Sequence, residues 1–111
     1  MKTLTIVKIG GNVIDDQKSL NKFLYDFSKL KGAKILVHGG GKLATLLSHQ
    51  LGIETKMIDG RRITDSETLK ITTMVYAGWI NKSITAQLNS KKIKAIGLCG
   101  ADVILIPATK R

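Results

Sequence analysis

Two short apolar runs, each followed by a cluster of glycines, restrict this chain more than any other feature. Residues 4–9 lead into the pair Gly10-Gly11, and residues 35–37 lead into a histidine and three further glycines. Short apolar runs bounded by glycine predict strands that are buried on both faces of a parallel sheet. Because such sheets bind ligands beyond the carboxyl ends of their strands, we expect both glycine clusters at one ligand-binding edge.

Helical patterns follow each of these strands. Apolar residues recur at three- and four-residue spacing over residues 16–30 and again over 43–51. Asp15 or Asp16 can cap the first helix, and Gly52 ends the second. The order is therefore strand, helix, strand, helix, which is typical of a sheet packed against helices.

A hairpin interrupts this alternation. Asp59-Gly60 separates residues 55–58 from residues 61–64, and a glycine there suits the positive φ angles of a two-residue hairpin turn. Neighbouring strand residues point to opposite faces, so only one of Arg61 and Arg62 can face a given ligand. An arginine here either binds a carboxylate through its fork or is a solvated edge charge, and both interpretations remain open.

A long helix and two more strands are predicted after the hairpin. A capping-box spacing begins at Thr64, and the helical pattern continues to about residue 89. Apolar residues cover more than one stripe of this helix, which indicates a second packing surface, and close packing would account for Gly78 near its middle. Buried strands are predicted at 93–99 and 103–106, on either side of a turn at 100–102.

These elements predict an α/β fold: a three-layer sandwich with a largely parallel central sheet and an inserted β-hairpin. A chain of 111 residues can bury a core for one domain but is too short for two ordinary ones. We therefore expect one domain over residues 1–111.

Composition limits the partners. Eighteen Lys and Arg against eight Asp and Glu give a formal charge of +10, which favours an anionic partner. The few aromatic residues lie in predicted helices, so a base-stacking nucleic-acid platform is not favoured, although nonspecific phosphate binding stays compatible with the charge. A single cysteine and two distant histidines predict neither a disulfide framework nor a zinc site, and no apolar run approaches the length of a membrane span. We expect a cytoplasmic protein.

Lys8 and the glycines are the residues expected to bind a ligand at the carboxyl edge of the predicted sheet. Glycine lets the backbone approach a ligand, and free N–H groups before a helix favour an anion. Lys8 lies in a strand predicted to be buried, so its ammonium should meet a negative group, unless it reaches solvent instead. His38 is expected to be packed and hydrogen-bonded, Cys99 to be a buried thiol, and Asp102 to end a turn.

Two phosphate-binding motifs were compared with the glycine triplet. A P-loop is excluded because Gly41-Lys42 is followed by Leu43 instead of Ser or Thr. Residues 39–44 do fit the dinucleotide pattern G-x-G-x-x-A, with Asp59 twenty residues beyond the first glycine. A small dinucleotide- or nucleotide-binding α/β module therefore remains an alternative, although Asp59 is better used in the hairpin turn.

Five motifs follow one another along the chain: residues 7–11 (Val-Lys-Ile-Gly-Gly), 37–41 (Val-His-Gly-Gly-Gly), 60–64 (Gly-Arg-Arg-Ile-Thr), 81–82 (Asn-Lys) and 97–102 (Gly-Leu-Cys-Gly-Ala-Asp). In this order they resemble the N-acetylglutamate kinases of the amino acid kinase family. The resemblance implies an enzyme of arginine biosynthesis that uses ATP with Mg²⁺ as co-substrate. The enzyme would phosphorylate the γ-carboxylate of an N-acylated glutamate and would need no tightly bound cofactor.

The same resemblance implies roles for individual residues. Lys8 would stabilise the transferring phosphoryl group, and the turn at Gly10 and Gly11 would approach the ATP phosphates. Gly40 and Gly41 would bind the acylglutamate, and Arg62 would hold its α-carboxylate; none of these residues is implied to bind a metal. The hairpin would resemble a substrate lid, and the helix at about 66–89 would join subunits of a homo-oligomer.

One part of the family pattern has no counterpart in these residues. Family members are about twice as long or longer, and their nucleotide-binding half lies after the matching region. We therefore expect residues 1–111 to be an amino-terminal acylglutamate-binding lobe, without the carboxy-terminal nucleotide-binding lobe and inactive by itself. The sequence does not distinguish an acetyl from a succinyl substrate.

Overall fold

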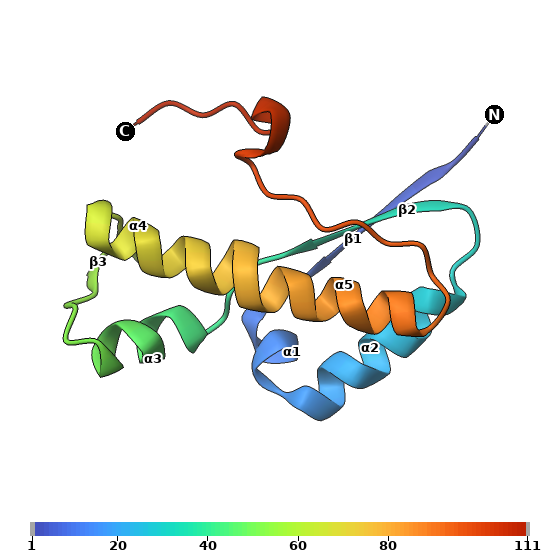
Figure 1. Cartoon of the computed structure of the whole chain (residues 1–111), viewed down its shortest axis with the longest axis horizontal. Coiled ribbons are helices and arrows are strands. Elements are labelled where there is room, and N and C mark those ends of the chain that lie inside the picture. Colours follow the sequence, from blue (N-terminus) through green and yellow to red (C-terminus); the bar gives the residue numbers. More distant parts are fainter. Residues whose placement is uncertain (1, 111) are drawn as a thin grey trace.

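The computed structural model describes residues 2–110, in which strands and helices alternate (Figure 1). The first part contains β1 (Leu4–Ile9), α1 (Gly11–Asp15), α2 (Gln17–Lys29), β2 (Ala33–His38) and α3 (Leu43–Gln50). The second part contains β3 (Lys56–Ile58), β4 (Arg61–Ile63), α4 (Ser66–Thr72), the π-helical η1 (Thr73–Ile80), α5 (Asn81–Ser90) and the 3₁₀ turn η2 (Asp102–Ile104). The helices predicted from periodicity are confirmed, whereas the short α1 was not predicted.

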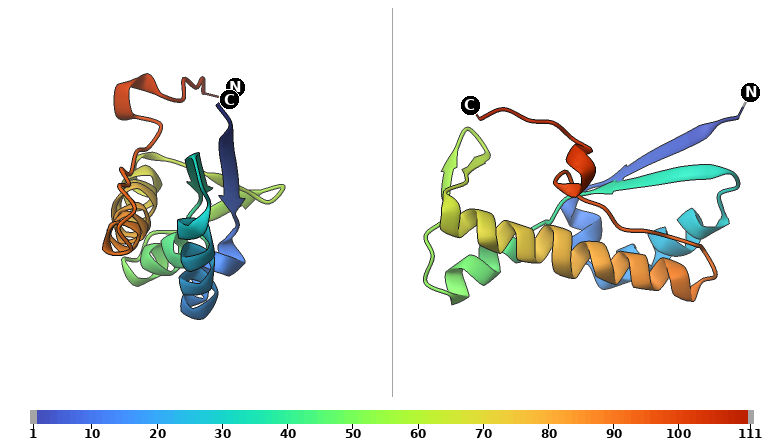
Figure 2. Two further views of the ribbon diagram at one scale, coloured as in Figure 1. Left: turned by 90° about the vertical axis from the view of Figure 1, so that its right-hand side faces the viewer. Right: turned by 45° about the horizontal axis from the view of Figure 1, so that its top comes forward.

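The two sheets give the fold its class. β1 pairs in parallel with β2, from Leu4 opposite Ala33 to Ile9 opposite His38, and β3 pairs with β4 in an antiparallel hairpin. An α/β fold with a parallel sheet and an inserted hairpin is therefore confirmed. Of the three predicted layers, the described residues contain the sheet and the helices packed against one of its faces (Figure 2).

The prediction that these strands are buried on both faces is wrong for the described residues. Burial alternates along β1 and β2, as expected when only one face of a sheet is covered. The inner face includes Ile9, which is 4% exposed, whereas Ile6 and Ile35 on the outer face are 63% and 46% exposed. The uninterrupted apolar run hid this alternation, because both faces carry apolar side chains.

Helix α2 supplies much of the core and is closed at both ends by side chains. The Asp16 carboxylate accepts a hydrogen bond from the Ser19 backbone N–H at 3.0 Å, and hydrogen bonding by Ser19 lowers the pKa of Asp16. Asp16 is therefore the cap, not Asp15. At the other end, the Lys34 ammonium donates to the carbonyls of Phe27 and Leu30 at 2.9 and 2.6 Å, which satisfies acceptors left free by the last turn.

One continuous helix spans residues 66–90, formed by α4, η1 and α5 (Figure 1), and we call it the long helix. Its cap is Asp65, whose carboxylate accepts from the Thr68 N–H at 2.8 Å, so the predicted capping box at Thr64 is one residue too early. That hydrogen bond lowers the pKa of Asp65. The π-helical middle was not predicted, and a Cβ at Gly78 would meet only its own helix, at 3.7 Å from the Thr73 carbonyl oxygen.

The two strands predicted after the long helix are wrong. Residues 93–99 pair with no strand in the described part of the chain, and residues 103–106 are exposed and overlap the 3₁₀ turn η2. A side chain of the long helix bonds backbone groups that would otherwise pair with a neighbouring strand. Asn89 donates to the carbonyl of Ala95 and accepts from its N–H, both at 3.1 Å. A strand pattern needs a neighbouring strand, which these described residues do not supply.

Candidate functional site

The two glycine turns meet at the carboxyl edge of the parallel sheet. The register ends with Ile9 opposite His38, so the chain leaves both strands at the same level. A Cβ atom added at Gly11 would lie 3.0 Å from the Cα atom of Gly41, which is in the left-handed region with φ of +55°. The close approach of the two backbones therefore leaves little room for a side chain at Gly11, and the positive φ of Gly41 also favours glycine.

The turns present free backbone donors. The carbonyl of Gly10 accepts from the N–H of Val13 at 3.2 Å, and the carbonyl of Gly40 accepts from that of Leu43 at 3.4 Å. Among the described residues, the N–H groups of Gly11, Gly40 and Gly41 donate to no backbone carbonyl outside the regular elements. Clustered free N–H groups are an arrangement that binds oxyanions.

The side chain of Asp15, at the end of α1, binds the backbone at the start of α3. Its two carboxylate oxygens accept from the Lys42 N–H at 3.1 and 3.2 Å. The sequence suggested this helix start as an anion site, and the anion there is a side chain of the same molecule. No local signal indicated the contact, since the two residues are 27 positions apart.

Gly40 is buried beneath an aromatic ring. A Cβ atom at this position would fall within the ring of Tyr76, which projects from η1 of the long helix. The close packing that the sequence suggested for Gly78 is therefore found at Gly40. This glycine has a structural reason to be there as well as the ligand-binding role implied by resemblance.

Lys8 lies on the uncovered side of β1. Its side chain is exposed and makes no hydrogen bond or ion pair within residues 2–110. The expectation of a buried ammonium is wrong because the sheet is covered on one face only, and the interpretation in which the lysine reaches solvent describes this structure. Lys8 still precedes the first glycine turn by one residue, Ile9.

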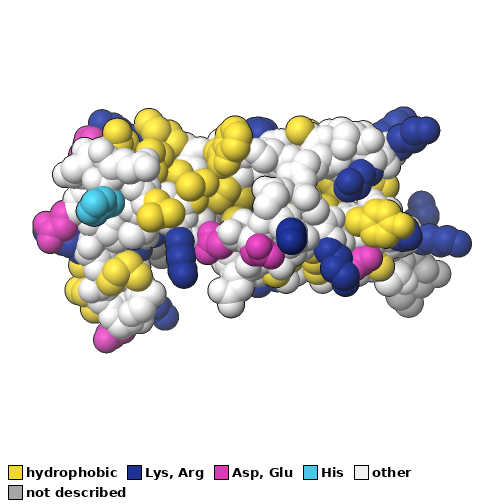
Figure 3. Space-filling model, turned by 90° about the horizontal axis from the view of Figure 1, so that it is seen from below, with side chains coloured by type: hydrophobic (Ala, Val, Ile, Leu, Met, Phe, Trp, Pro, Cys, Tyr) yellow, Lys and Arg dark blue, Asp and Glu magenta, His cyan; other side chains and the backbone are white. Residues whose placement is uncertain are grey.

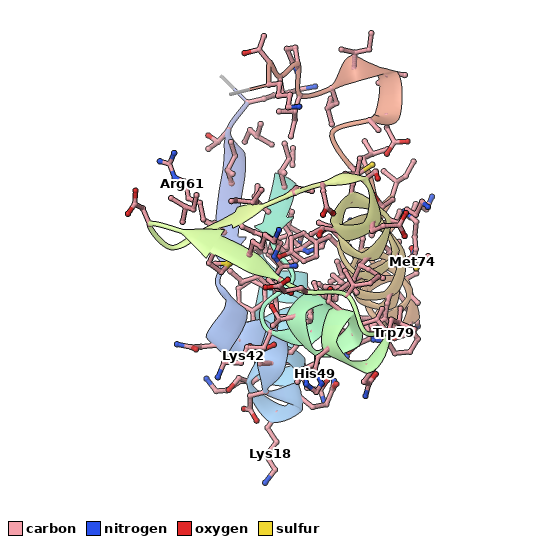
Figure 4. All side chains as sticks on the ribbon, turned by 90° about the vertical axis from the view of Figure 1, so that its left-hand side faces the viewer. Lys18, Lys42, His49, Arg61, Met74 and Trp79 are labelled. Atoms are coloured by element: carbon pink, nitrogen blue, oxygen red, sulfur yellow. The ribbon has the colours of Figure 1, made fainter. Side chains whose placement is uncertain are left out.

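Arg62 and Arg61 point in different directions from the hairpin. Asp59 and Gly60 have φ angles of +51° and +73°, which confirms the turn. Arg61 is exposed and points away from the body of the molecule (Figure 4). Arg62 turns toward α3, where its Nη2 atom donates to the Thr45 hydroxyl at 2.8 Å.

One hydrogen-bond donor of the Arg62 guanidinium is unpaired within residues 2–110. Its Nη1 atom is buried and has no hydrogen-bond partner in the described part of the chain. A buried donor without an acceptor is unfavourable by about 1–3 kcal/mol, so an acceptor that reached this atom would bind favourably. Thr45 lies in the first turn of α3, directly after the second glycine turn, so Arg62 faces the same region of the molecule.

His38 belongs to a polar cluster that the sequence did not predict. Its Nε2 atom lies 3.0 Å from the Asn81 amide nitrogen, and its Nδ1 atom lies 2.8 Å from the Gly39 carbonyl oxygen. Because an amide nitrogen only donates, Nε2 accepts and Nδ1 donates. Asn81 also donates to the Leu98 carbonyl at 3.3 Å. The cluster therefore connects the long helix both to the end of β2 and to the segment that follows the helix. A packed, hydrogen-bonded His38 is confirmed.

The motif at 97–102 has a structural role. The Lys82 ammonium donates to the Gly97 carbonyl at 2.8 Å. The Asp102 carboxylate accepts from the Cys99 N–H at 2.7 Å and so closes the turn, which confirms the structural interpretation of Asp102. That hydrogen bond lowers the pKa of Asp102. Cys99 is a free thiol of intermediate exposure rather than a buried one.

The positive charge is not concentrated at the glycine turns. In Figure 3, Lys and Arg side chains gather at the end of the molecule where α2 and α5 end. Exposed lysines there include Lys29, Lys31, Lys91 and Lys92. Because α2 leads into the amino end of β2, this end lies opposite the carboxyl edge. Cations near helix C-termini also offset the helix dipole, which gives part of the charge a structural role.

Two hollows lie beside the predicted site. A groove of about 500 Å³ between α1, α2, α3 and the long helix is lined by Asp15, Lys42 and Trp79 together with apolar and uncharged polar side chains. A second hollow, on the hairpin, is lined by residues 58–59 and 61–63, including both arginines. Within residues 2–110, no group of three or more His, Cys, Asp or Glu side chains could hold a metal ion. The helices found there lack the combined length and hydrophobicity that a membrane-spanning helix needs.

Comparison with known proteins gives consistent matches. The amino acid kinase family model matches residues 3–111. The acetylglutamate kinases of Cytophaga hutchinsonii and Phocaeicola vulgatus are 60% and 56% identical to this chain over 111 and 108 residues. The alignments cover 100% and 97% of this chain but only 42% of each relative, so the chain spans about two fifths of the length of these curated relatives.

A solved structure shares the fold. The crystal structure of smu.665 from Streptococcus mutans UA159 matches with a TM-score of 0.66 at 20% identity. The match covers 83% of this chain and 38% of that chain. Over four fifths of its length, the chain therefore folds like part of a larger protein.

Proposed function

Because the chain belongs to the amino acid kinase family, we propose that residues 1–111 form the amino-terminal, acylglutamate-binding lobe of an acetylglutamate kinase. The whole enzyme would transfer the γ-phosphoryl group of ATP to the γ-carboxylate of N-acetyl-L-glutamate, a step of arginine biosynthesis in the cytoplasm. The observation that carries the proposal is the backbone contact between the two glycine turns, at the edge that Arg62 also faces.

Each turn has a separate task in this proposal. The N–H groups of Gly10 and Gly11 approach the ATP phosphates, while those of Gly40 and Gly41 bind the acylglutamate. Phosphoryl transfer depends on positive groups and dipoles placed around the transferring oxygens, and it needs little covalent chemistry from the protein. Lys8, one residue before the first turn, would supply a positive charge once the nucleotide phosphates lie beside it.

Arg62 holds the α-carboxylate of the acylglutamate. Its buried Nη1 atom lacks an acceptor, and its Nη2 atom is fixed by Thr45, so the guanidinium is oriented before a ligand arrives. A carboxylate oxygen is the acceptor that suits an arginine donor best. When the ligand carboxylate accepts a hydrogen bond from Nη1, the buried donor is satisfied, and this contributes to the affinity.

ATP would arrive with Mg²⁺ as its counterion. The described residues contain no cluster of His, Cys, Asp or Glu side chains fit to hold the metal. The nucleotide-binding lobe would lie in the part of the relatives that this chain does not span.

The long helix is proposed to join subunits of a homo-oligomer. Leu69, Met74 and Trp79 are 56%, 56% and 69% exposed, so large apolar side chains of this helix are uncovered within the described residues. Met74 and Trp79 lie on the same side of the molecule in Figure 4. A second copy covering this side would bury them.

Calorimetric titration separates the proposal from the dinucleotide alternative. We expect saturable 1:1 binding of N-acetyl-L-glutamate and none of NAD⁺, because Asp59 lies in the turn of a hairpin whose strands do not pair with β1 or β2, the sheet that carries the glycine triplet. Binding of NAD⁺ that Asp59→Ala abolishes would instead establish a dinucleotide-binding module. Titration with N-succinyl-L-glutamate in the same buffer identifies the preferred acyl group.

The 111 residues alone are expected to be inactive. Lys8, the glycine turns and Arg62 account for one side of the site, and the remaining groups proposed to hold the nucleotide lie outside residues 1–111. Incubation with ATP, Mg²⁺, N-acetyl-L-glutamate and hydroxylamine should therefore give no hydroxamate. The acetylglutamate kinase of Cytophaga hutchinsonii is the positive control. Turnover by the 111-residue chain comparable to that control would refute the division of labour between two lobes.

A further inference from the structure

We infer that Asp15 is a positioning residue, which fixes the distance between the two glycine turns by bonding across them. The inference rests on the proposed function, because it assigns one turn to the donor phosphates and the other to the acceptor. In-line transfer needs the two reactants held close and aligned, and a small displacement of either reduces the rate steeply. The distance between the two turns therefore affects the rate of phosphoryl transfer.

Asp15 is connected to the first turn through the hydrogen-bonded helix α1. Helix α1 begins at Gly11 and ends at Asp15, and its first turn is closed by hydrogen bonds from Val13 and Ile14 to the Gly10 carbonyl at 3.2 and 3.3 Å. The carboxylate at the end of this short helix therefore moves with Gly10 and Gly11. A shift of Gly10 and Gly11, the turn proposed to bind the ATP phosphates, would therefore shift the Asp15 carboxylate as well.

The same carboxylate is bonded to the second turn. Both oxygens accept from the Lys42 N–H, at 3.1 and 3.2 Å, and Lys42 directly follows Gly41. A Cβ atom at Gly41 would collide with the Asp15 carboxylate, so the glycine there leaves room for this contact. The negative charge also lies at the amino end of α3, where the helix dipole favours it.

Asp15 has no other task among the described residues. Asp16, not Asp15, caps α2, and neither of the two ion pairs in residues 2–110 includes Asp15. Its hydrogen bonds to the protein go to Lys42. The side chain therefore serves the contact between turns and not the stability of its own helix.

Three variants of the 111-residue chain test the inference. Asp15→Ala removes the acceptor, Asp15→Asn keeps one acceptor oxygen without the charge, and Asp16→Ala makes the same change one residue away, where the carboxylate bonds only Ser19. The measurements are amide hydrogen exchange at Lys42, the amide chemical shifts of Gly11 and Gly41, and affinity for N-acetyl-L-glutamate. Circular dichroism verifies that each variant is folded.

We expect Asp15→Ala to lose exchange protection at Lys42 and to shift the amides of both Gly11 and Gly41. Its affinity should fall about two- to tenfold, the contribution of one hydrogen bond that holds the turn in place. Asp15→Asn should keep the protection and most of the affinity, and Asp16→Ala should leave all three measurements at the turns unchanged while lowering the melting temperature.

Two results would overturn the inference: unchanged protection and shifts in Asp15→Ala, or the same loss of protection in Asp16→Ala. A third would be an Asp15→Asn chain that behaves like Asp15→Ala, since an acceptor would then not suffice. If the unmodified chain binds no N-acetyl-L-glutamate, the proposed function fails, and exchange at Lys42 together with the shift of Gly11 still decides whether Asp15 joins the turns.

Discussion

Replacing Gly40 by alanine is expected to destabilise the chain by about 1–3 kcal/mol, the usual effect of forcing extra volume into a packed site. The added methyl group would fall within the ring of Tyr76, so either the ring must leave its place or the turn must move away from the long helix. For a domain of this size, each kcal/mol lowers the melting temperature by about 4–8 °C. Thermal denaturation followed by circular dichroism measures the change.

Gly39 and Tyr76 supply the controls. A Cβ at Gly39 would meet nothing within 4 Å, and its φ is not positive, so Gly39→Ala should be nearly neutral. In a Tyr76→Ala background the ring is gone, and Gly40→Ala should then have little further effect. Because the two residues are in contact, the double-mutant cycle should give a large coupling energy. Additive effects of the two substitutions would show that the ring does not determine the need for glycine.

Replacing Arg62 by alanine is expected to weaken binding of N-acetyl-L-glutamate about 10- to 100-fold. A hydrogen bond to a charged group contributes about 1.5–3 kcal/mol, and 1.4 kcal/mol corresponds to a factor of ten in affinity. The buried Nη1 donor is the atom proposed to bind the α-carboxylate. Calorimetric titration of the folded variant gives the ratio of dissociation constants directly.

Arg61→Ala is the matched control, since it removes the same charge from the same strand but from a side chain that points away from the body of the molecule (Figure 4). Its affinity should stay within about twofold of the unmodified chain, because an exposed charge contributes little. Arg62→Lys should not restore binding, since an ammonium lacks the planar fork. Equal losses in Arg61→Ala and Arg62→Ala would mean that net charge, and not a specific carboxylate contact, attracts the ligand.

The part of the fold that local patterns determine could be predicted from the sequence. Glycines after an apolar run ended β1 and β2, and Asp59-Gly60 is typical of a tight turn between two short strands. Each of these signals lies within a few residues of the element that it specifies. The meeting of the two turns then followed from the parallel sheet, in which carboxyl ends share an edge.

Contacts between distant residues left no comparable signal. Asp15 and Lys42 are 27 residues apart, and His38 and Asn81 are 43 apart, so neither pair has a spacing that could be recognised. Residues 93–99 do show the alternating burial of a strand, but a strand exists only where another pairs with it. The sequence favoured a buried Lys8 and left its exposure as the alternative for the same reason, because it does not show which faces of a sheet the described residues cover.

A two-dimensional amide NMR spectrum, recorded while N-acetyl-L-glutamate is added to the 111-residue chain, tests the central claim most directly. The claim is that the second glycine turn and the hairpin arginine form the acylglutamate side of a kinase site. Saturable shifts should concentrate at the amides of Gly40 and Gly41 and at the Nε–H of Arg62, while lysines at the opposite end, such as Lys29, stay unchanged. Shifts that avoid the turn and Arg62, or that spread over the exposed lysines, would contradict the claim.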